Sequence, residues 1–424
     1  MNIILISVDS LRADFMEIAK EQGVELPNFE RLFNTSYYFS EAVTQGTSSI
    51  QSHSSALSGL GPWTIGTGVH LHFPQPHHSI FYRLAEMGYR TISWHRGVVD
   101  LADRPDEKAM WDNQAGNNTC ADEFINDICK WIKRPPKENY CAFLHFRYVH
   151  WPYGDCEGWH WGDERYEQAK DLILRLQRIG NIAEVKKLYT ECLLRMDGKL
   201  GKLLDSLRGG ELVILFGDHG DDFGEHKPDK QNFSITDAHV NSPWESVTNV
   251  PLFISMPHRK PLMINRRVRL LDIAPTIWNI LEWPRVSAFE GFPLVHSNSK
   301  PCGLSYPSET WGDFYCSRES SETGKAWGRD YRIIKMNNFK FFMELYDGIY
   351  RTFDLDKDPG ETQDITDKYP DVAQWLASFV HSPEWHDLNM YEQSKSGRLP
   401  RLIENQYKII KEIDRKVEKQ RYEN

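Results

Sequence analysis

The chain has 424 residues, a hydrophobic fraction of 40%, a charged fraction of 26% and a formal net charge of −10. This length and composition are those of a globular protein with one large domain and a smaller one attached. The sequence has no basic stripe before its last residues and no apolar run long enough for a transmembrane helix. We therefore expect neither a nucleic-acid partner nor a membrane segment.

The start of the chain, MNIILISVDS, has no basic residues and no small-residue cleavage site, so we expect no secretion signal. The 7 cysteines are odd in number and form no CxxC pair. We interpret them as reduced thiols. Together these features predict a cytoplasmic protein.

Apolar runs alternate with helical patterns in the first two thirds of the chain. NIILISVD at residues 2–9 has no polar alternation, which is typical of a parallel strand buried on both faces. Further strands are predicted at residues 88–95, 140–149, 211–220 and 250–257. Helices are predicted at residues 26–36, 79–88, 120–133, 167–179 and 184–209. This alternation predicts an α/β fold, with a mostly parallel sheet sandwiched by helices.

The pattern changes beyond residue 300. Residues 332–347 and 350–356 are expected to form hairpin strands, and residues 371–380 a helix. We predict a main domain at residues 1–300, a small C-terminal α+β subdomain at 301–395 and a charged helix at 396–424.

The charged C-terminal helix has apolar residues near one face. They are Leu402, Tyr407, Ile410 and Ile413. This face either docks on the surface of the same chain or makes an oligomer contact.

Acidic and histidine side chains follow the predicted parallel strands. Asp9 ends the first strand, His150 follows the strand at 140–149, and Asp218 and His219 open the loop GDHGDDFGEH. Because such sheets bind ligands at the carboxyl ends of their strands, we expect these side chains near one site. Carboxylate and imidazole together suit zinc, manganese or a mixed site. The alternatives are that Asp9 caps a helix, that His150 holds its loop by hydrogen bonds, and that the acidic loop binds nothing.

The segment TSSIQSHSSALSG at residues 47–59 is rich in hydroxyl side chains. It is either a solvated loop or a turn that presents a nucleophile at the start of a helix. The rest of the sequence favours the second interpretation, because the order of its motifs resembles a known family.

That family is the sulfatases of the alkaline phosphatase superfamily. The resemblance rests on VDSLRADF, PNFERLF, the hydroxyl-rich segment ending in LSG, GYRT, VHWPY, GDHGDDFGEH, VPLFI, LDIAPT and FDLDKDPGE, in this order. It covers nearly the whole chain. It implies an alkaline phosphatase/sulfatase-like fold and a sulfuric or phosphoric ester hydrolase.

The family's nucleophile motif is Cys or Ser, then x-Pro-Ser-Arg, a helix and Leu-Thr-Gly. The resemblance places Ser49 at the nucleophile, Gln51 at the Pro and His53 at the Arg, with Thr47 and Ser48 as alternative nucleophiles. Family members convert the nucleophile to formylglycine, which needs the Pro and the Arg. Ser49 is therefore expected to act unmodified, activated by a metal at a helix start. Relatives of this kind act mostly on phosphate or phosphonate esters.

The resemblance also implies a metal site formed by Asp9, Ser49, Asp218 and His219. Ser10 replaces the second Asp of the family's N-terminal pair, so one coordination position is lost or filled by water. We expect one divalent ion, which is Ca, Mn or Zn. A second ion is not expected, because no histidine follows Asp197 in the way that two-metal relatives require.

Other residues are implied to contact the substrate. His150 and His239 are candidate catalytic residues that bind ester oxygens or protonate the leaving group. Arg12, His53 and Lys230 are candidate substrate-binding residues, although Lys230 could equally be a solvated loop lysine.

The predicted function is a metal-dependent hydrolase that cleaves sulfate or phosphate/phosphonate esters through a covalent Ser49 intermediate. Its substrate would be an anionic ester of a small molecule, a glycan or a lipid. One alternative is a transferase that passes the phospho or sulfo group to a sugar or lipid hydroxyl. Another is a catalytically degenerate member that binds an ester or a partner without turnover.

Overall fold

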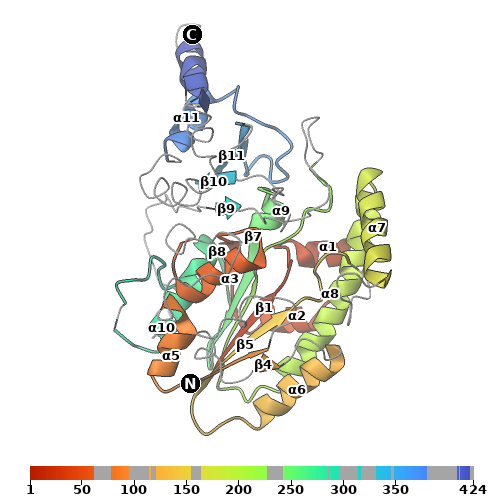
Figure 1. Ribbon diagram of the computed structural model, residues 1–424, viewed down its shortest axis with the longest axis vertical. Helices are drawn as coiled ribbons and strands as arrows, with labels where there is room; N and C mark the ends of the chain where they lie inside the picture. Colours follow the sequence, from red (N-terminus) through yellow and green to blue (C-terminus); the bar gives the residue numbers. More distant parts are fainter. Residues whose placement is uncertain are drawn as a thin grey trace.

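The computed structural model describes residues 1–61, 78–94, 114–115, 121–153, 164–226, 242–284, 286–295, 314–316, 331–344, 348–379, 408–409 and 411–420. Its centre is an eight-stranded sheet with the order β4-β3-β5-β1-β6-β7-β2-β8 (Figure 1). The strands are β1 (Ile3–Val8), β2 (Tyr37–Val43), β3 (Arg90–Trp94), β4 (Gln114–Ala115), β5 (Tyr140–Phe146), β6 (Leu212–Gly217), β7 (Asn249–Ser255) and β8 (Leu262–Arg269).

The sheet is mostly parallel, as the sequence predicts. β1 pairs in parallel with β5 on one side and β6 on the other. β7 runs antiparallel to both of its neighbours, β6 and β2. All residues of β1, β5 and β6 are buried, which explains why their sequences are apolar without alternation.

Helices cover both faces of this sheet (Figure 1). One face packs on α1 (Phe15–Glu21), α2 (Pro27–Phe33), α6 (Ala121–Lys133), α7 (Glu164–Arg178) and α8 (Ile182–Leu204). The other face packs on α3 (Ser49–Ser58), α5 (Ile80–Glu86) and α10 (Ile273–Ile280), which follows the 3-10 turn η3 (Leu270–Asp272). Alternate residues of β1 enter the two cores, Ile4 the first and Ile3 the second. The α/β sandwich predicted from the sequence is therefore confirmed.

A second, antiparallel sheet forms the C-terminal subdomain. Its strands are β9 (Phe314–Cys316), β10 (Tyr331–Met336), β11 (Phe339–Glu344) and β12 (Tyr350–Asp354), and helix α11 (Pro370–Phe379) packs against it. The predicted smaller α+β unit is confirmed. The predicted boundaries, 300/301 and 395/396, lie outside the described residues and stay predictions.

The C-terminal helix docks on this subdomain. Ile409, Ile413 and Val417 are buried in the same core as Ile334 and Leu376. Of the apolar residues predicted on its inner face, Ile413 is buried, whereas Leu402, Tyr407 and Ile410 lie outside the described residues. Intramolecular docking thus uses this helix face, and the oligomer contact stays a prediction.

Buried charges join the subdomain to the main domain at the short helix α9 (Glu245–Thr248). Nζ of Lys340 lies 2.9 Å from Glu245 and 2.6 Å from Glu361, and Nζ of Lys335 lies 2.6 Å from Glu245. Burial alone would raise the pKa of Glu245, but the charges of Lys335 and Lys340 hold that pKa well below its usual range. The two domains therefore meet through a paired ionic network.

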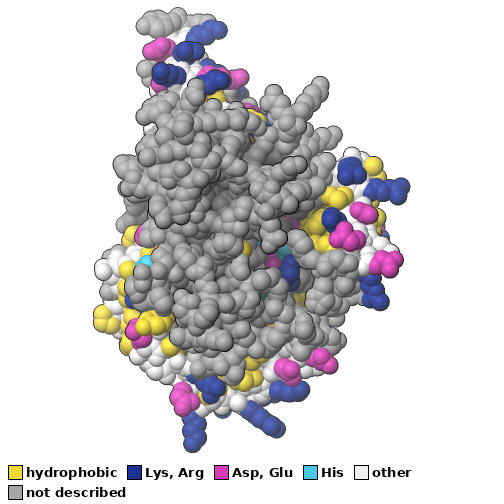
Figure 2. Space-filling view, in the orientation of Figure 1, with side chains coloured by type: hydrophobic (Ala, Val, Ile, Leu, Met, Phe, Trp, Pro, Cys, Tyr) yellow, Lys and Arg dark blue, Asp and Glu magenta, His cyan; other side chains and the backbone are white. Residues whose placement is uncertain are grey.

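The part of the chain that the structure describes contains no helix that is both long and apolar enough to cross a membrane. Figure 2 shows acidic and basic side chains intermixed on the described parts of one face, for example over α7 and the C-terminal helix.

Candidate active site

The candidate site lies where β1 and β6 end side by side. Their parallel register pairs Val8 with Gly217, so Asp9 and Asp218 leave the sheet at neighbouring positions. Asp9 is 2% exposed and Asp218 is fully buried. The sheet therefore brings together two carboxylates that are separated by more than half of the main domain in sequence.

The carboxylate of Asp218 is oriented by backbone groups. Its Oδ1 accepts hydrogen bonds from the N–H groups of Ser10, at 3.1 Å, and His219, at 2.8 Å. Ser10 has a φ of 61°, a left-handed conformation that is uncommon for residues other than glycine. The hydroxyl of Ser10 lies 3.4 Å from Oδ1 of Asp9. The serine that replaces the expected second Asp thus lies at the site and supports both carboxylates.

Ser49 faces the same carboxylates from the start of α3. Its Oγ lies 3.4 Å from Nε2 of His219, and that Nε2 lies 3.5 Å from Oδ1 of Asp9. Ser49 is half-buried, and Ser48 before it is the N-cap residue with extended backbone. Of the alternative nucleophiles, Thr47 is fully buried. Ser48 is half-buried like Ser49, and the contact with His219 favours Ser49 over it.

The tautomer of His219 follows from its other ring nitrogen. Nδ1 lies 2.9 Å from the carbonyl oxygen of Gly220, which can only accept a hydrogen bond, so Nδ1 carries the proton. Nε2 then presents a lone pair towards Asp9 and Ser49. A lone pair beside carboxylate oxygens is the arrangement expected when a cation lies between them.

The donor set fits a metal ion. One ligand atom each from Asp9, Asp218 and His219 lies within 4.8 Å of the others, and all three residues are buried. Among the described residues, Oδ2 of Asp218 has no hydrogen-bond partner. Burial raises the pKa of Asp218, and the nearby charge of Asp9 raises it further. A buried, unsatisfied carboxylate oxygen of this kind is explained by a cation.

His150 and Arg147 approach Asp9 from the end of β5. Nε2 of His150 lies 3.9 Å from Oδ1 of Asp9, and Nε of Arg147 lies 3.3 Å from Oδ2. Nδ1 of His150 shares a short hydrogen bond with the carbonyl of Trp151. Burial alone would raise the pKa of Asp9, but the charge of His150 and the nearby imidazoles of His145 and His219 hold this pKa well below its usual range. Arg147 was not predicted from the sequence, although its position just past a parallel strand was a usable signal.

His53 lies one helical turn beyond Ser49 and is fully buried. Its Nε2 is 2.7 Å from Oγ of Ser7 and 3.8 Å from Oδ2 of Asp218. The predicted substrate contact of His53 stays a prediction. Its buried position favours a role in supporting the helix turn that carries Ser49.

Arg12 is held by acidic partners. Its guanidinium forms ion pairs with Asp14, at 2.8 Å, and Glu225, at 2.6 Å, and stacks over the ring of Phe223. These contacts tie the end of β1 to the loop that carries Asp218 and His219. They favour positioning of that loop, and the predicted substrate-binding role of Arg12 stays a prediction.

Two of the predicted site residues, His239 and Lys230, lie outside the described residues and stay predictions. Asp197 was not expected to hold a second ion, and its carboxylate accepts hydrogen bonds from the N–H groups of Asn28 and Phe29 at the start of α2.

Two polar residues inside strands were missed. His145 lies on β5 and Ser7 on β1, and the register places them directly opposite each other on the face covered by α3. Both are fully buried. Each is a polar residue near the carboxyl end of an otherwise apolar strand, and this signal could have identified them.

Comparison with known proteins assigns the family. The sulfatase family model matches residues 1–282. The chain belongs to the sulfatase family. As predicted, it is an enzyme of the sulfuric ester hydrolase class. An arylsulfatase of Clostridium perfringens is 21% identical over 471 aligned positions, which cover 89% of this chain and 93% of the relative.

Solved structures share the sulfatase fold. A protein determined in complex with its substrate D-glucosamine-2-N,6-O-disulfate is 15% identical with a TM-score of 0.66, covering 91% of this chain and 99% of that one. The phosphonate monoester hydrolase of Agrobacterium radiobacter is 14% identical with a TM-score of 0.64, covering 89% of this chain and 94% of the other.

Proposed function

We propose that this sulfatase-family enzyme cleaves a sulfate, phosphate or phosphonate ester through a covalent intermediate on Ser49. The observation that carries the proposal is the position of the Ser49 hydroxyl, at the start of α3 and 3.4 Å from His219. The free N–H groups and the dipole of a helix start favour the negative charge of an ester bound there. Because Ser49 is only half-buried, an ester can reach it from solvent.

Asp9, Ser49, Asp218 and His219 would hold one divalent ion. An imidazole ligand beside two carboxylates favours manganese or zinc over calcium, which prefers oxygen ligands only. When bound, such an ion lowers the pKa of a coordinated hydroxyl and neutralises negative charge on the transferred group.

The chain's own side chains account for the bond changes. Ser49 Oγ loses its proton to solvent and bonds to sulfur or phosphorus, while the bond from that atom to the ester oxygen breaks. His150 gives the departing oxygen a proton, so that a neutral alcohol leaves. Water then attacks the sulfur or phosphorus, His150 takes a proton from it, and Ser49 is released with its proton restored from solvent.

Arg147 is a suitable partner for the charged oxygens of the ester. Its side chain is 29% exposed and its Nε lies 3.3 Å from Asp9, so it combines access to solvent with proximity to the site. His239, Lys230, Arg12 and His53 remain proposed contributors to catalysis or substrate binding.

The substrate class is an anionic ester of a small molecule or a glycan. The neighbour solved with a disulfated glucosamine supports a sulfated sugar, and the phosphonate monoester hydrolase supports a phosphorus ester. A lipid ester is the remaining candidate. We also propose a cytoplasmic location, supported by the described cysteines Cys129, Cys141 and Cys192, which are free and buried.

A paired assay tests the proposal. The purified chain and its Ser49→Ala variant are assayed on 4-nitrophenyl sulfate, 4-nitrophenyl phosphate and a phenylphosphonate ester, with Mn²⁺, Zn²⁺ or Ca²⁺ supplied. The proposal predicts turnover of at least one ester that the variant abolishes, with an unmodified Ser49 by intact mass. Equal turnover by the variant would refute the Ser49 intermediate. Adduct formation that releases product only when a sugar or lipid acceptor is added would instead indicate a transferase.

A further inference from the structure

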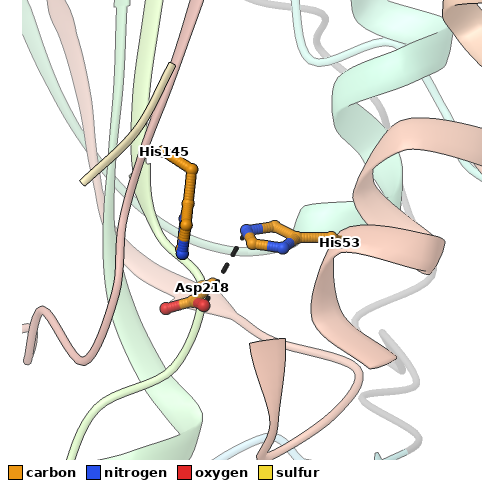
Figure 3. A group of neighbouring side chains, drawn as sticks. All are labelled: His53, His145 and Asp218. Carbon is orange, nitrogen blue, oxygen red and sulfur yellow. Dashed lines mark ion pairs between the residues drawn. The ribbon is translucent and has the colours of Figure 1, made fainter. Parts of the chain in front are cut away.

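A second group of buried ligand atoms lies directly beside the first. His53 on α3, His145 on β5 and Asp218 after β6 point towards one another from three different elements (Figure 3). One ligand atom of each lies within 4.8 Å of the others, and all three side chains are fully buried. The proposed bond changes involve neither His53 nor His145.

We propose that His53, His145 and Asp218 bind a second divalent cation, with Asp218 shared between the two sites. Imidazole nitrogen and carboxylate oxygen are the ligands that zinc takes in proteins, at about 2.0–2.2 Å. Small rotations of the three side chains would bring their ligand atoms to a common ion. The inference deepens the proposed function and rests on its metal site, because both sites need Asp218.

The hydrogen bonding of His145 supports this assignment. Among the described residues, neither ring nitrogen of His145 has a hydrogen-bond partner, although Nε2 lies 3.4 Å from Oδ2 of Asp9. A fully buried imidazole without hydrogen bonds is costly, and a bound cation would remove that cost. The rings of Phe143 and Phe216 contact that of His53, so apolar side chains line this position.

The carboxylate of Asp218 is arranged to bridge two ions. Its Oδ1 is occupied by the two N–H donors from Ser10 and His219. Its Oδ2 lies 3.8 Å from Nε2 of His53 on one side and 3.8 Å from Nε2 of His219 on the other. Carboxylate-bridged ions in two-metal sites are about 3.5–4 Å apart, which this spacing of ligands allows.

The second ion would position the nucleophile. His53 is on the helix turn that follows Ser49, so an ion on His53, His145 and Asp218 would link the start of α3 to the ends of β5 and β6. Because all three ligands are fully buried, this ion would stay beneath Ser49 and would leave the ester to the first site.

Metal stoichiometry tests the proposal without measuring activity. The chain is stripped with chelator, equilibrated with Zn²⁺ by dialysis and analysed for bound zinc per chain. We expect two equivalents for the wild type, one for His145→Gln, one for His219→Ala and none for Asp218→Asn. Cobalt substitution gives an independent readout, since loss of one ion in His145→Gln should remove one set of visible absorption bands.

Ser7→Ala provides the matched control. Ser7 shares a hydrogen bond with His53 in the same pocket but is not one of the proposed ligands, so this variant should keep both ions. Circular dichroism checks that each variant is folded, and His53→Gln replaces His145→Gln if the latter is not. One equivalent in the wild type, absent in His219→Ala and unchanged in His145→Gln, would overturn the second site and leave the first intact. No bound zinc in the wild type would overturn both.

Discussion

The hydroxyl oxygen of Ser49 lies 3.4 Å from Nε2 of His219, although the two residues are 170 positions apart in the sequence. The distance is set by two separate structural elements, the start of α3 and the loop after β6. Because Nδ1 of His219 is committed to the carbonyl of Gly220, the unprotonated Nε2 faces the serine. This relationship makes Ser49 the side chain whose removal is most informative.

Ser49→Ala should reduce kcat by on the order of 10⁴-fold or more, because loss of a covalent nucleophile removes the pathway itself. The measurement is steady-state turnover of whichever 4-nitrophenyl ester the wild type cleaves. Ser48→Ala is the matched control, since the Ser48 side chain makes no capping hydrogen bond. Comparable losses in both variants would argue against a specific role of Ser49.

Chelation should lower both metal content and activity, and His219→Ala should prevent recovery. Manganese or zinc should restore the stripped wild type better than calcium, because one proposed ligand is an imidazole nitrogen. Elemental analysis of the dialysed protein and a thermal melt measure occupancy and stabilisation together. Full activity in the demetallated protein would contradict the metal-dependent mechanism.

His150→Gln should affect esters according to their leaving group. An alkyl alcohol needs a proton to leave, so its ester should lose about 10²–10⁴-fold in kcat. 4-Nitrophenolate leaves without a proton, so its ester should be much less affected. Comparing the two esters in wild type and variant separates proton donation from simple damage to the site, which would slow both equally.

Lys340→Met should destabilise the protein by about 3–5 kcal/mol, because it leaves the buried carboxylate of Glu361 without its cation and removes one of the two lysines that pair with Glu245. Denaturant unfolding measures the change. Lys357→Met is the control on the same subdomain. Lys357 pairs with Asp354 at 2.6 Å but its side chain is 80% exposed, so water screens the pair and its loss should change the stability far less.

His226 should make part of the stability depend on pH. Burial alone would lower the pKa of His226, but its hydrogen bond to Asp222 and the charges of Asp222 and Glu361 raise this pKa above the unfolded value of 6.5. A group whose pKa is raised on folding stabilises the folded state fully at pH values below its unfolded pKa. This stabilisation is lost as the pH rises through the folded pKa. His226→Gln should therefore lose stability relative to wild type at pH 5.5, but less at high pH. A difference that is independent of pH would show that His226 acts through packing, such as its stacking on Trp244.

The fold could be predicted largely because its central strands are buried on both faces. β8 was missed because it lies at the edge of the sheet, where its exposed residues and arginines give no apolar run. The reversed direction of β7 could not be predicted, because an apolar run carries no information about strand direction.

The candidate site, like the fold, could be predicted only in part. Asp9, Asp218 and His219 could be predicted because each follows a parallel strand. His145 carried a usable signal as a polar residue in an apolar strand, but its pairing with Ser7 could not be predicted, because it depends on the register between β1 and β5. The partners of Arg12 could not be predicted from the sequence either. Glu225 reaches Arg12 only because the loop beyond β6 folds back on the end of β1.

The contacts of the loop that carries Asp218 and His219 limit how far the chain can be truncated from its C-terminal end. His226 at its far end shares a hydrogen bond of 3.1 Å with the carbonyl of Gly360, and Glu361 accepts one from the N–H of Glu245. A fragment truncated after residue 282 would retain Ser49 and the other proposed catalytic and metal-binding residues, but would lose these supports. We therefore expect the minimal folding unit to extend past residue 361, beyond the segment that family membership alone would delimit.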